Sequence, residues 1–186
     1  DFVKQIDAQN VLIVTNRPAI ANSWYQDYEK FFGTISGYRF ISTNDSIKDS
    51  RLAVDYKTFL QIKNKEPDVK LIYFLSLQDM KGSIHFGGKY DKLHEIKEIA
   101  WDVLVIDEAH EGVDTFKTDI AFDNIKRKFT LHLSGTPFKA LANDKFRQEC
   151  IYNWTYADEQ KKKREFEGTD TNPYKSLPRL NMYTYQ

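Results

Sequence analysis

Four short, continuously apolar runs constrain the fold of this 186-residue chain more than any other feature. Polar or turn residues bound each run, and the runs span 11–15, 71–75, 103–106 and 130–133. Continuous apolarity, rather than alternation, is typical of strands that are buried on both faces, as in a parallel sheet. Residues 37–42 form a weaker candidate strand.

The segments between these runs are long enough for helices, which we expect over 20–32, 51–64, 90–99 and 119–126. Pro18 stands where the first of these helices would begin, and Gly33 stands where it would end. Alternation of strands and helices predicts a doubly wound α/β fold with a mostly parallel sheet. Sites in such folds lie at the carboxyl ends of the strands.

Composition excludes several classes of protein. The chain has 27 Lys and Arg against 27 Asp and Glu, so any binding to nucleic acid must depend on local patches. The single cysteine, Cys150, excludes an intramolecular disulfide and a multi-cysteine zinc site. No run approaches the roughly 18 apolar residues of a membrane span, so we expect a cytoplasmic protein without a membrane partner.

Two of the apolar runs lead directly into polar motifs. The run 103–106 is followed by Asp107-Glu108-Ala109-His110, which places two carboxylates at the edge of the expected sheet. Asp107 can hold a Mg²⁺ that bridges nucleotide phosphates, and Glu108 can orient and deprotonate a water. The same two residues are also suited to capping a following helix. The run 130–133 leads into Ser134-Gly135-Thr136-Pro137.

These motifs make residues 9–140 resemble the superfamily 2 helicases and translocases, whose motifs II and III read DEAH and S-[AG]-T-P. Two upstream segments, Val14-Thr15-Asn16-Arg17-Pro18 and Leu75-Ser76-Leu77-Gln78, resemble the loops that contact the nucleic-acid backbone in that family. The resemblance implies a RecA-like three-layer sandwich of the P-loop NTPase class. The 81–99 insert and residues 134–139 look most like the restriction-enzyme-type group, which includes motor subunits of type I and type III restriction systems.

The resemblance also implies roles for individual residues. Asp107 would bind Mg²⁺, Glu108 would activate the water, and His110 would couple the nucleotide to motif III, formed by Ser134, Gly135 and Thr136. The residues implied to contact the nucleic-acid backbone are Thr15, Arg17, Ser76 and Gln78. The implied cofactors are ATP and Mg²⁺. The implied partners are nucleic acid, with DNA favoured over RNA, and other subunits of a restriction–modification complex.

The resemblance divides the chain into two parts. Residues 1–140 would form a partial first RecA-like domain with motifs Ia to III, and 141–186 would connect it to a second motor domain. The sequence ends in a strand-like stretch, 180–186, and contains no phosphate loop of the form G-x-x-x-x-G-K-[ST]. Residues 1–9 look like the tail of the helix that follows such a loop. We therefore expect these 186 residues alone not to hydrolyse ATP.

Two segments imitate other functional motifs. The glycine-rich segment Gly82–Tyr90 is out of register for a phosphate loop and is interpreted as a surface loop. Pro67-Asp68 and Asp79-Met80-Lys81 imitate a metal-dependent nuclease, but the two aspartates would lie at opposite ends of one strand, more than about 20 Å apart. The favoured hypothesis is therefore the motor, either as a DNA translocase or helicase or, alternatively, as an RNA helicase of the DEAH class. A non-catalytic α/β binding scaffold is the second hypothesis, and a nuclease is the third.

The histidines and the basic run near the end of the chain show no metal or nucleic-acid motif by their spacing. The four histidines, His85, His94, His110 and His132, show no zinc-type i, i+4 spacing, and His132 is expected in the core. The basic run 161–164 lies among acidic residues, which favours a solvated helix face of mixed charge.

Overall fold

The computed structural model describes residues 2–33, 36–44, 47, 50, 52–107, 122–136, 146–168 and 171–178. The chain divides into two compact units, residues 1–142 and residues 143–186, and each is described by itself. In the part of the chain that the structure describes, no helix is long and apolar enough to cross a membrane.

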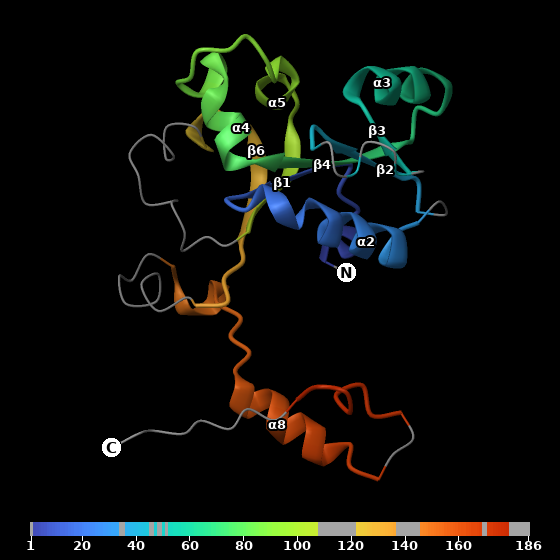
Figure 1. Ribbon diagram of the computed structural model, residues 1–186, viewed down its shortest axis with the longest axis vertical. Coiled ribbons are helices and arrows are strands. Elements are labelled where there is room, and N and C mark those ends of the chain that lie inside the picture. Colours follow the sequence, from blue (N-terminus) through green and yellow to red (C-terminus); the bar gives the residue numbers. More distant parts are fainter. Residues whose placement is uncertain are drawn as a thin grey trace. The chain divides into compact units, whose positions relative to one another are not determined.

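The first unit is built on six parallel strands in the order β3-β2-β4-β1-β5-β6. Their bounds are β1 Asn10–Thr15, β2 Tyr38–Ser42, β3 Ala53–Val54, β4 Lys70–Ser76, β5 Trp101–Asp107 and β6 Arg127–His132. All five predicted strands that lie in described residues are therefore present (Figure 1). The sixth strand of the sheet, the two-residue β3, was not predicted, and it lies where a continuous helix over 51–64 was expected.

The helices of this unit are α1 Phe2–Gln5, α2 Ala21–Phe31, α3 Tyr56–Lys65, α4 Leu77–Gly82 and α5 His94–Glu98. A short 3-10 turn that starts at Pro18 leads into α2, as predicted for the start of this helix. Gly33 follows the end of α2 with a positive φ of 56°, as predicted for its end. The helix predicted over 51–64 begins only at Tyr56. There the Asp55 side chain accepts a hydrogen bond from the Thr58 N–H at 2.6 Å.

Two other helix predictions had different outcomes. The helix expected over 90–99 was too long, because only His94–Glu98 is helical. Most of the helix expected over 119–126 lies outside the described residues, and residues 122–123 are helical.

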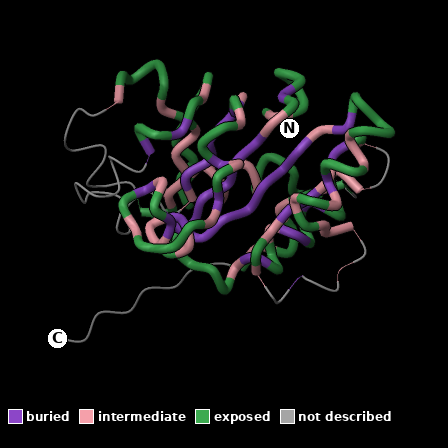
Figure 2. Tube along the Cα trace, turned by 90° about the horizontal axis from the view of Figure 1, so that it is seen from above, coloured by how far each residue is buried: buried purple, intermediate pink, exposed green. Residues whose placement is uncertain are grey.

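The sheet separates two hydrophobic clusters, which makes the unit a three-layer α/β sandwich. Side chains alternate along β1: Leu12 and Val14 join the cluster beneath α3, α4 and α5, and Val11 and Ile13 join the cluster beneath α2. Helix α2 lies on one side of the sheet, and α3, α4 and α5 lie on the other (Figure 1). Buried residues run along the central strands (Figure 2). The predicted RecA-like fold class therefore agrees with the structure.

Strand β6 departs from the prediction that it is buried on both faces. Residues 128–130 are exposed, and 52% of the Phe129 surface is accessible. His132, expected in the core, is only half-buried. The reason is topological, because β6 is the last strand in the order of the described sheet and pairs with β5 alone. The apolar sequence of 130–133 does not reveal this position.

The second unit contains a 3-10 turn, Gln148–Cys150, and helix α8, Tyr156–Glu165. Thr155 and Asp158 form a capping box at the start of α8. The basic run 161–164 lies on this helix, and Lys162 forms an ion pair with Glu165 at 2.7 Å, which confirms the mixed-charge interpretation. The strand predicted over 180–186 lies outside the described residues.

Candidate functional site

Three of the predicted site residues end three neighbouring strands at one level. Thr15 is the last residue of β1, and its register partners are Ser76 at the end of β4 and Asp107 at the end of β5. On the next strand, His132 pairs with Ile106, so Ser134 follows two residues beyond that point. The carboxyl edge of the sheet therefore brings Thr15, Ser76, Asp107 and Ser134 to one side, as a parallel sheet requires.

Asp107 is half-buried, and a residue far away in the sequence holds its carboxylate. The indole N–H of Trp24 on α2 donates a hydrogen bond to Asp107 Oδ2 at 3.1 Å. Tryptophan has a single side-chain donor that needs a partner when it packs against a protein surface, and here that partner is the candidate metal ligand. No local motif in the sequence marks Trp24 as part of the site.

The loop after β1 is shaped by the Thr15 side chain. Thr15 is 1% exposed, and its hydroxyl accepts a hydrogen bond from the Arg17 N–H at 3.1 Å. Asn44, in the segment after β2, donates to the Pro18 carbonyl at 2.8 Å and ties this loop to its neighbour. Arg17 itself is exposed. The loop therefore carries Arg17 at the surface, whereas the Thr15 hydroxyl is used inside the protein.

The loop after β4 follows the same plan. Ser76 is 5% exposed and caps α4, because its hydroxyl accepts from the Asp79 N–H at 3.0 Å and donates to Asp79 Oδ2 at 2.8 Å. Asp79 also pairs with Lys92 at 3.2 Å. Gln78, in the first turn of α4, is exposed. Gln78 rather than Ser76 is thus available at the surface.

The motif III residues form a compact turn at the same edge. The Ser134 hydroxyl accepts from the Thr136 N–H at 3.2 Å, and both Gly135 and Thr136 are exposed. The remaining predicted residues of the site, Glu108 and His110, lie outside the described residues.

Asp107 offers one carboxylate of the kind that magnesium binds. A carboxylate at the end of a strand, oriented by a neighbouring donor, is an oxygen ligand of the kind that Mg²⁺ accepts alongside water and phosphate oxygens. Asp107 could therefore serve as one ligand of such an ion.

The glycine-rich segment 82–90 is not a phosphate-binding loop, as predicted. Its amide groups bond within the segment: Gly88 N–H donates to Ser83 O at 2.7 Å, and the N–H groups of Lys89 and Tyr90 both donate to Gly82 O at 3.0 Å. Amides used in this way cannot cradle a phosphate. The nuclease-like aspartates also separate as predicted, because Asp68 precedes β4 and Asp79 lies beyond its end.

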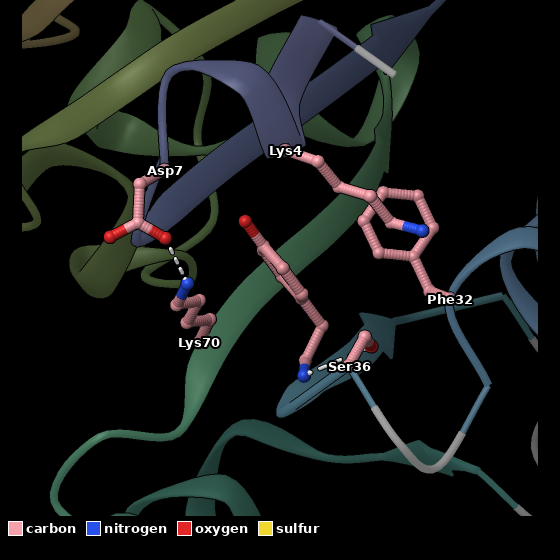
Figure 3. Close-up of a pocket in the computed structure, with 6 residues that line it drawn as sticks. Lys4, Asp7, Phe32, Ser36 and Lys70 are labelled. Carbon is pink, nitrogen blue, oxygen red and sulfur yellow. Dashed lines mark hydrogen bonds and ion pairs between the residues drawn. The ribbon is translucent and has the colours of Figure 1, made fainter.

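A pocket of about 360 Å³ lies away from this edge, near the amino ends of β2 and β4. Figure 3 shows Lys70 turned toward Asp7, with which it forms an ion pair, and Lys4 beside the ring of Phe32. Burial raises the pKa of Tyr38, which also lines the pocket, to about 12. Both lysines already have partners, and none of the predicted site residues within the described ranges lines this pocket.

Two histidines lie together in space, which the sequence analysis missed. The rings of His85 and His94 have centroids 4.2 Å apart, and Asp91 lies within reach of both. Their spacing in the sequence matches no helical metal motif, so only the folded 81–99 insert brings them together.

Comparison with known proteins agrees with this geometry. The family described as type III restriction enzyme, res subunit (ResIII), matches residues 1–139. A protein of Mycoplasma pneumoniae (strain ATCC 29342 / M129 / Subtype 1), named as the C-terminus of a type II restriction enzyme and methyltransferase, is 25% identical over 228 aligned residues. This alignment covers 100% of the chain and 30% of the relative, so the chain spans less than a third of that protein's length. With a family match over most of its residues, the chain belongs to the ResIII family of type III restriction enzyme res subunits.

Proposed function

We propose that these residues form part of the first motor domain of a nucleic-acid-dependent ATPase of a restriction system, a helicase or translocase that acts on DNA. Residues 1–140 would supply motifs Ia to III, and 141–186 would lead to a second RecA-like domain. The proposal depends above all on one observation: Thr15, Ser76 and Asp107 end adjacent strands in register. The family membership supports it.

In this proposal the nucleotide side of the edge is built around Asp107. Its carboxylate, which accepts the hydrogen bond from Trp24, would hold the Mg²⁺ that accompanies ATP. That ion would supply the charge neutralisation that phosphoryl transfer needs. Glu108 follows directly and activates the attacking water. His110, Ser134, Gly135 and Thr136 link the state of the nucleotide to the strand that is bound.

The nucleic-acid side of the edge uses the loops after β1 and β4. Arg17 and Gln78 are exposed, so we assign the direct contacts with backbone phosphates to them. Thr15 and Ser76 are buried, and their hydroxyls fix the two loops that carry these contacts. Contacts of this kind position a strand without reading its bases, as a motor that moves along any sequence requires.

The test is ATP hydrolysis by the complete protein that contains this chain, measured with and without DNA or RNA. We expect DNA to stimulate turnover, and Glu108→Gln to abolish the stimulated rate. The 186-residue chain alone should show the same negligible rate with and without this substitution, because it contains no phosphate loop sequence.

Other outcomes separate the alternatives. Stimulation by RNA but not DNA would assign the protein to the RNA helicases. No nucleotide turnover, with intact binding of nucleic acid, would support the scaffold. Cleavage of DNA by the chain alone, dependent on Asp68 and Asp79, would support the nuclease.

A further inference from the structure

We propose that His85, Asp91 and His94 form a zinc site in the 81–99 insert. The site would lie outside the nucleotide and nucleic-acid edge, and the proposal does not depend on the motor function. Its ligands would be the Nε2 atoms of both histidines and Oδ1 of Asp91.

The three ligand atoms converge with nearly the spacing that a metal requires. All three lie within 4.8 Å of one another. Asp91 Oδ1 is 2.6 Å from His94 Nε2 and 3.8 Å from His85 Nε2. A tetrahedral zinc ion with bonds of about 2.0–2.1 Å separates its ligands by about 3.3 Å, between the two observed distances.

His85 lacks a partner that the site would supply. Its Nε2 atom is buried and accepts or donates no hydrogen bond in the structure, and its side chain is only 17% exposed. Buried polar atoms are nearly always satisfied, so an orphaned imidazole nitrogen facing a carboxylate and a second imidazole calls for an explanation. A metal ion bound to Nε2 provides one.

The backbone around the ligands is held in an unusual and well-fixed arrangement. Leu93, between Asp91 and His94, has φ +63°, a left-handed conformation that is costly for a leucine. Leu93 is nevertheless 8% exposed and packs in the core. At Gly88, a Cβ would lie 2.2 Å from the Gly82 carbonyl carbon, so the loop folds tightly upon itself. Strain that the surroundings maintain is often found at sites that bind a ligand.

The ligand types select the metal. Imidazole nitrogens with one carboxylate suit Zn²⁺ and its first-row neighbours, whereas Mg²⁺ and Ca²⁺ prefer sites made of oxygen alone. Asp91 and His94 are exposed, with 68% and 56% of their side-chain surfaces accessible, so water can complete the coordination. The ion would fasten the insert, which holds α4 through the Lys92–Asp79 ion pair.

The experiment measures Zn²⁺ binding to the full chain, freed of metal and without a histidine tag, in competition with a chromophoric chelator. We expect one saturable site that Mg²⁺ does not occupy. Loss of a residue that hydrogen-bonds to a metal ligand typically weakens metal binding 10–100-fold. His94→Ala and Asp91→Asn remove ligands themselves, so each should weaken Zn²⁺ binding by about 100-fold or more. Both substituted side chains are exposed, so these variants should fold normally.

Two control variants should bind Zn²⁺ as tightly as the unsubstituted chain. Cys150→Ser removes the exposed thiol, another common zinc ligand, and Asp68→Asn repeats the carboxylate substitution at an exposed site elsewhere. Binding that is lost in Cys150→Ser but kept in His94→Ala and Asp91→Asn would overturn the proposal. So would the absence of saturable Zn²⁺ binding, which would leave Asp91 and His94 as an ordinary surface ion pair.

Discussion

The hydrogen bond from Trp24 to Asp107 gives the candidate magnesium ligand a fixed direction. A hydrogen bond to a charged group contributes about 1.5–3 kcal/mol, and here it orients the carboxylate that would hold the metal. Trp24→Phe keeps the aromatic ring but removes the donor. We expect this variant of the complete protein to fold normally and to need a higher Mg²⁺ concentration for half-maximal ATP turnover.

The matched control is Trp154→Phe, which changes a tryptophan of the second unit that stacks on Tyr174. It should leave the Mg²⁺ dependence unchanged. Identical Mg²⁺ curves for wild type and Trp24→Phe would show that Trp24 does not position the ligand.

The sequence could place Asp107 because the motif and the strand that delivers it are contiguous. It could not place Trp24, which acts across 83 residues, or the contact of His85 with His94, which depends on a tightly folded loop. The burial of two site residues also could not be predicted from the sequence. Thr15 and Ser76 were expected to contact the nucleic-acid backbone, but both are buried. Hydroxyls that follow a strand are often used to shape the next turn.

At the scale of elements, Asp102 fastens the amino ends of three strands. Its carboxylate, on β5, accepts from the N–H groups of Gln9 at 2.7 Å and Asn10 at 3.0 Å, and from Lys128 on β6 at 2.6 Å. Burial raises the pKa of Asp102, but the hydrogen bonds from Lys128, Asn10 and Gln9 outweigh it and hold this pKa below its usual value.

Replacing this carboxylate should cost stability in a pH-dependent way. Because the pKa of Asp102 is lower in the folded protein, its contribution is fully present above the unfolded value of about 4 and is lost as the pH falls through the folded pKa. Asp102→Asn should therefore lower the free energy of unfolding by about 1–3 kcal/mol at pH 7. Urea denaturation at several pH values measures this difference.

The comparison with Asp68→Asn provides the control, because Asp68 is exposed and precedes β4. The stability difference for Asp102→Asn should narrow below pH 4. If the difference in the free energy of unfolding between wild type and Asp102→Asn stayed constant between pH 7 and pH 3, the charge of Asp102 would not contribute to stability.

Strands that are buried on both faces were predictable from their continuous apolar runs, whereas the edge strand and the short helix were predicted less well. Strands β1, β4 and β5 are central, and their continuous apolar runs gave the correct assignment. Strand β6 has a similar run but lies at the edge of the described sheet, so its predicted burial was wrong. The short α5 was overestimated because Leu93, in a left-handed conformation, delays its start.

At the scale of the molecule, the two edges of the sheet carry different groups of polar residues. The carboxyl edge carries Thr15, Ser76, Asp107 and Ser134, whereas the amino edge carries the Asp102 fastener and the pocket with the Lys70–Asp7 pair. The wider assignment to a motor extends beyond the chain, which spans 30% of its relative. It is therefore best tested in the complete protein.

The most direct measurement compares one substitution at the two edges. Nucleic-acid-stimulated ATP turnover of the complete protein is measured for Asp107→Asn and for Asp7→Asn, a change of the same charge at an exposed residue of the amino edge. Loss of a metal ligand removes several kcal/mol of transition-state stabilisation, so Asp107→Asn should reduce turnover on the order of 100-fold or more. Asp7→Asn should leave it unchanged, because an exposed ion pair contributes little. Equal rates for the two variants, or a larger loss with Asp7→Asn, would contradict the assignment of catalysis to the carboxyl edge.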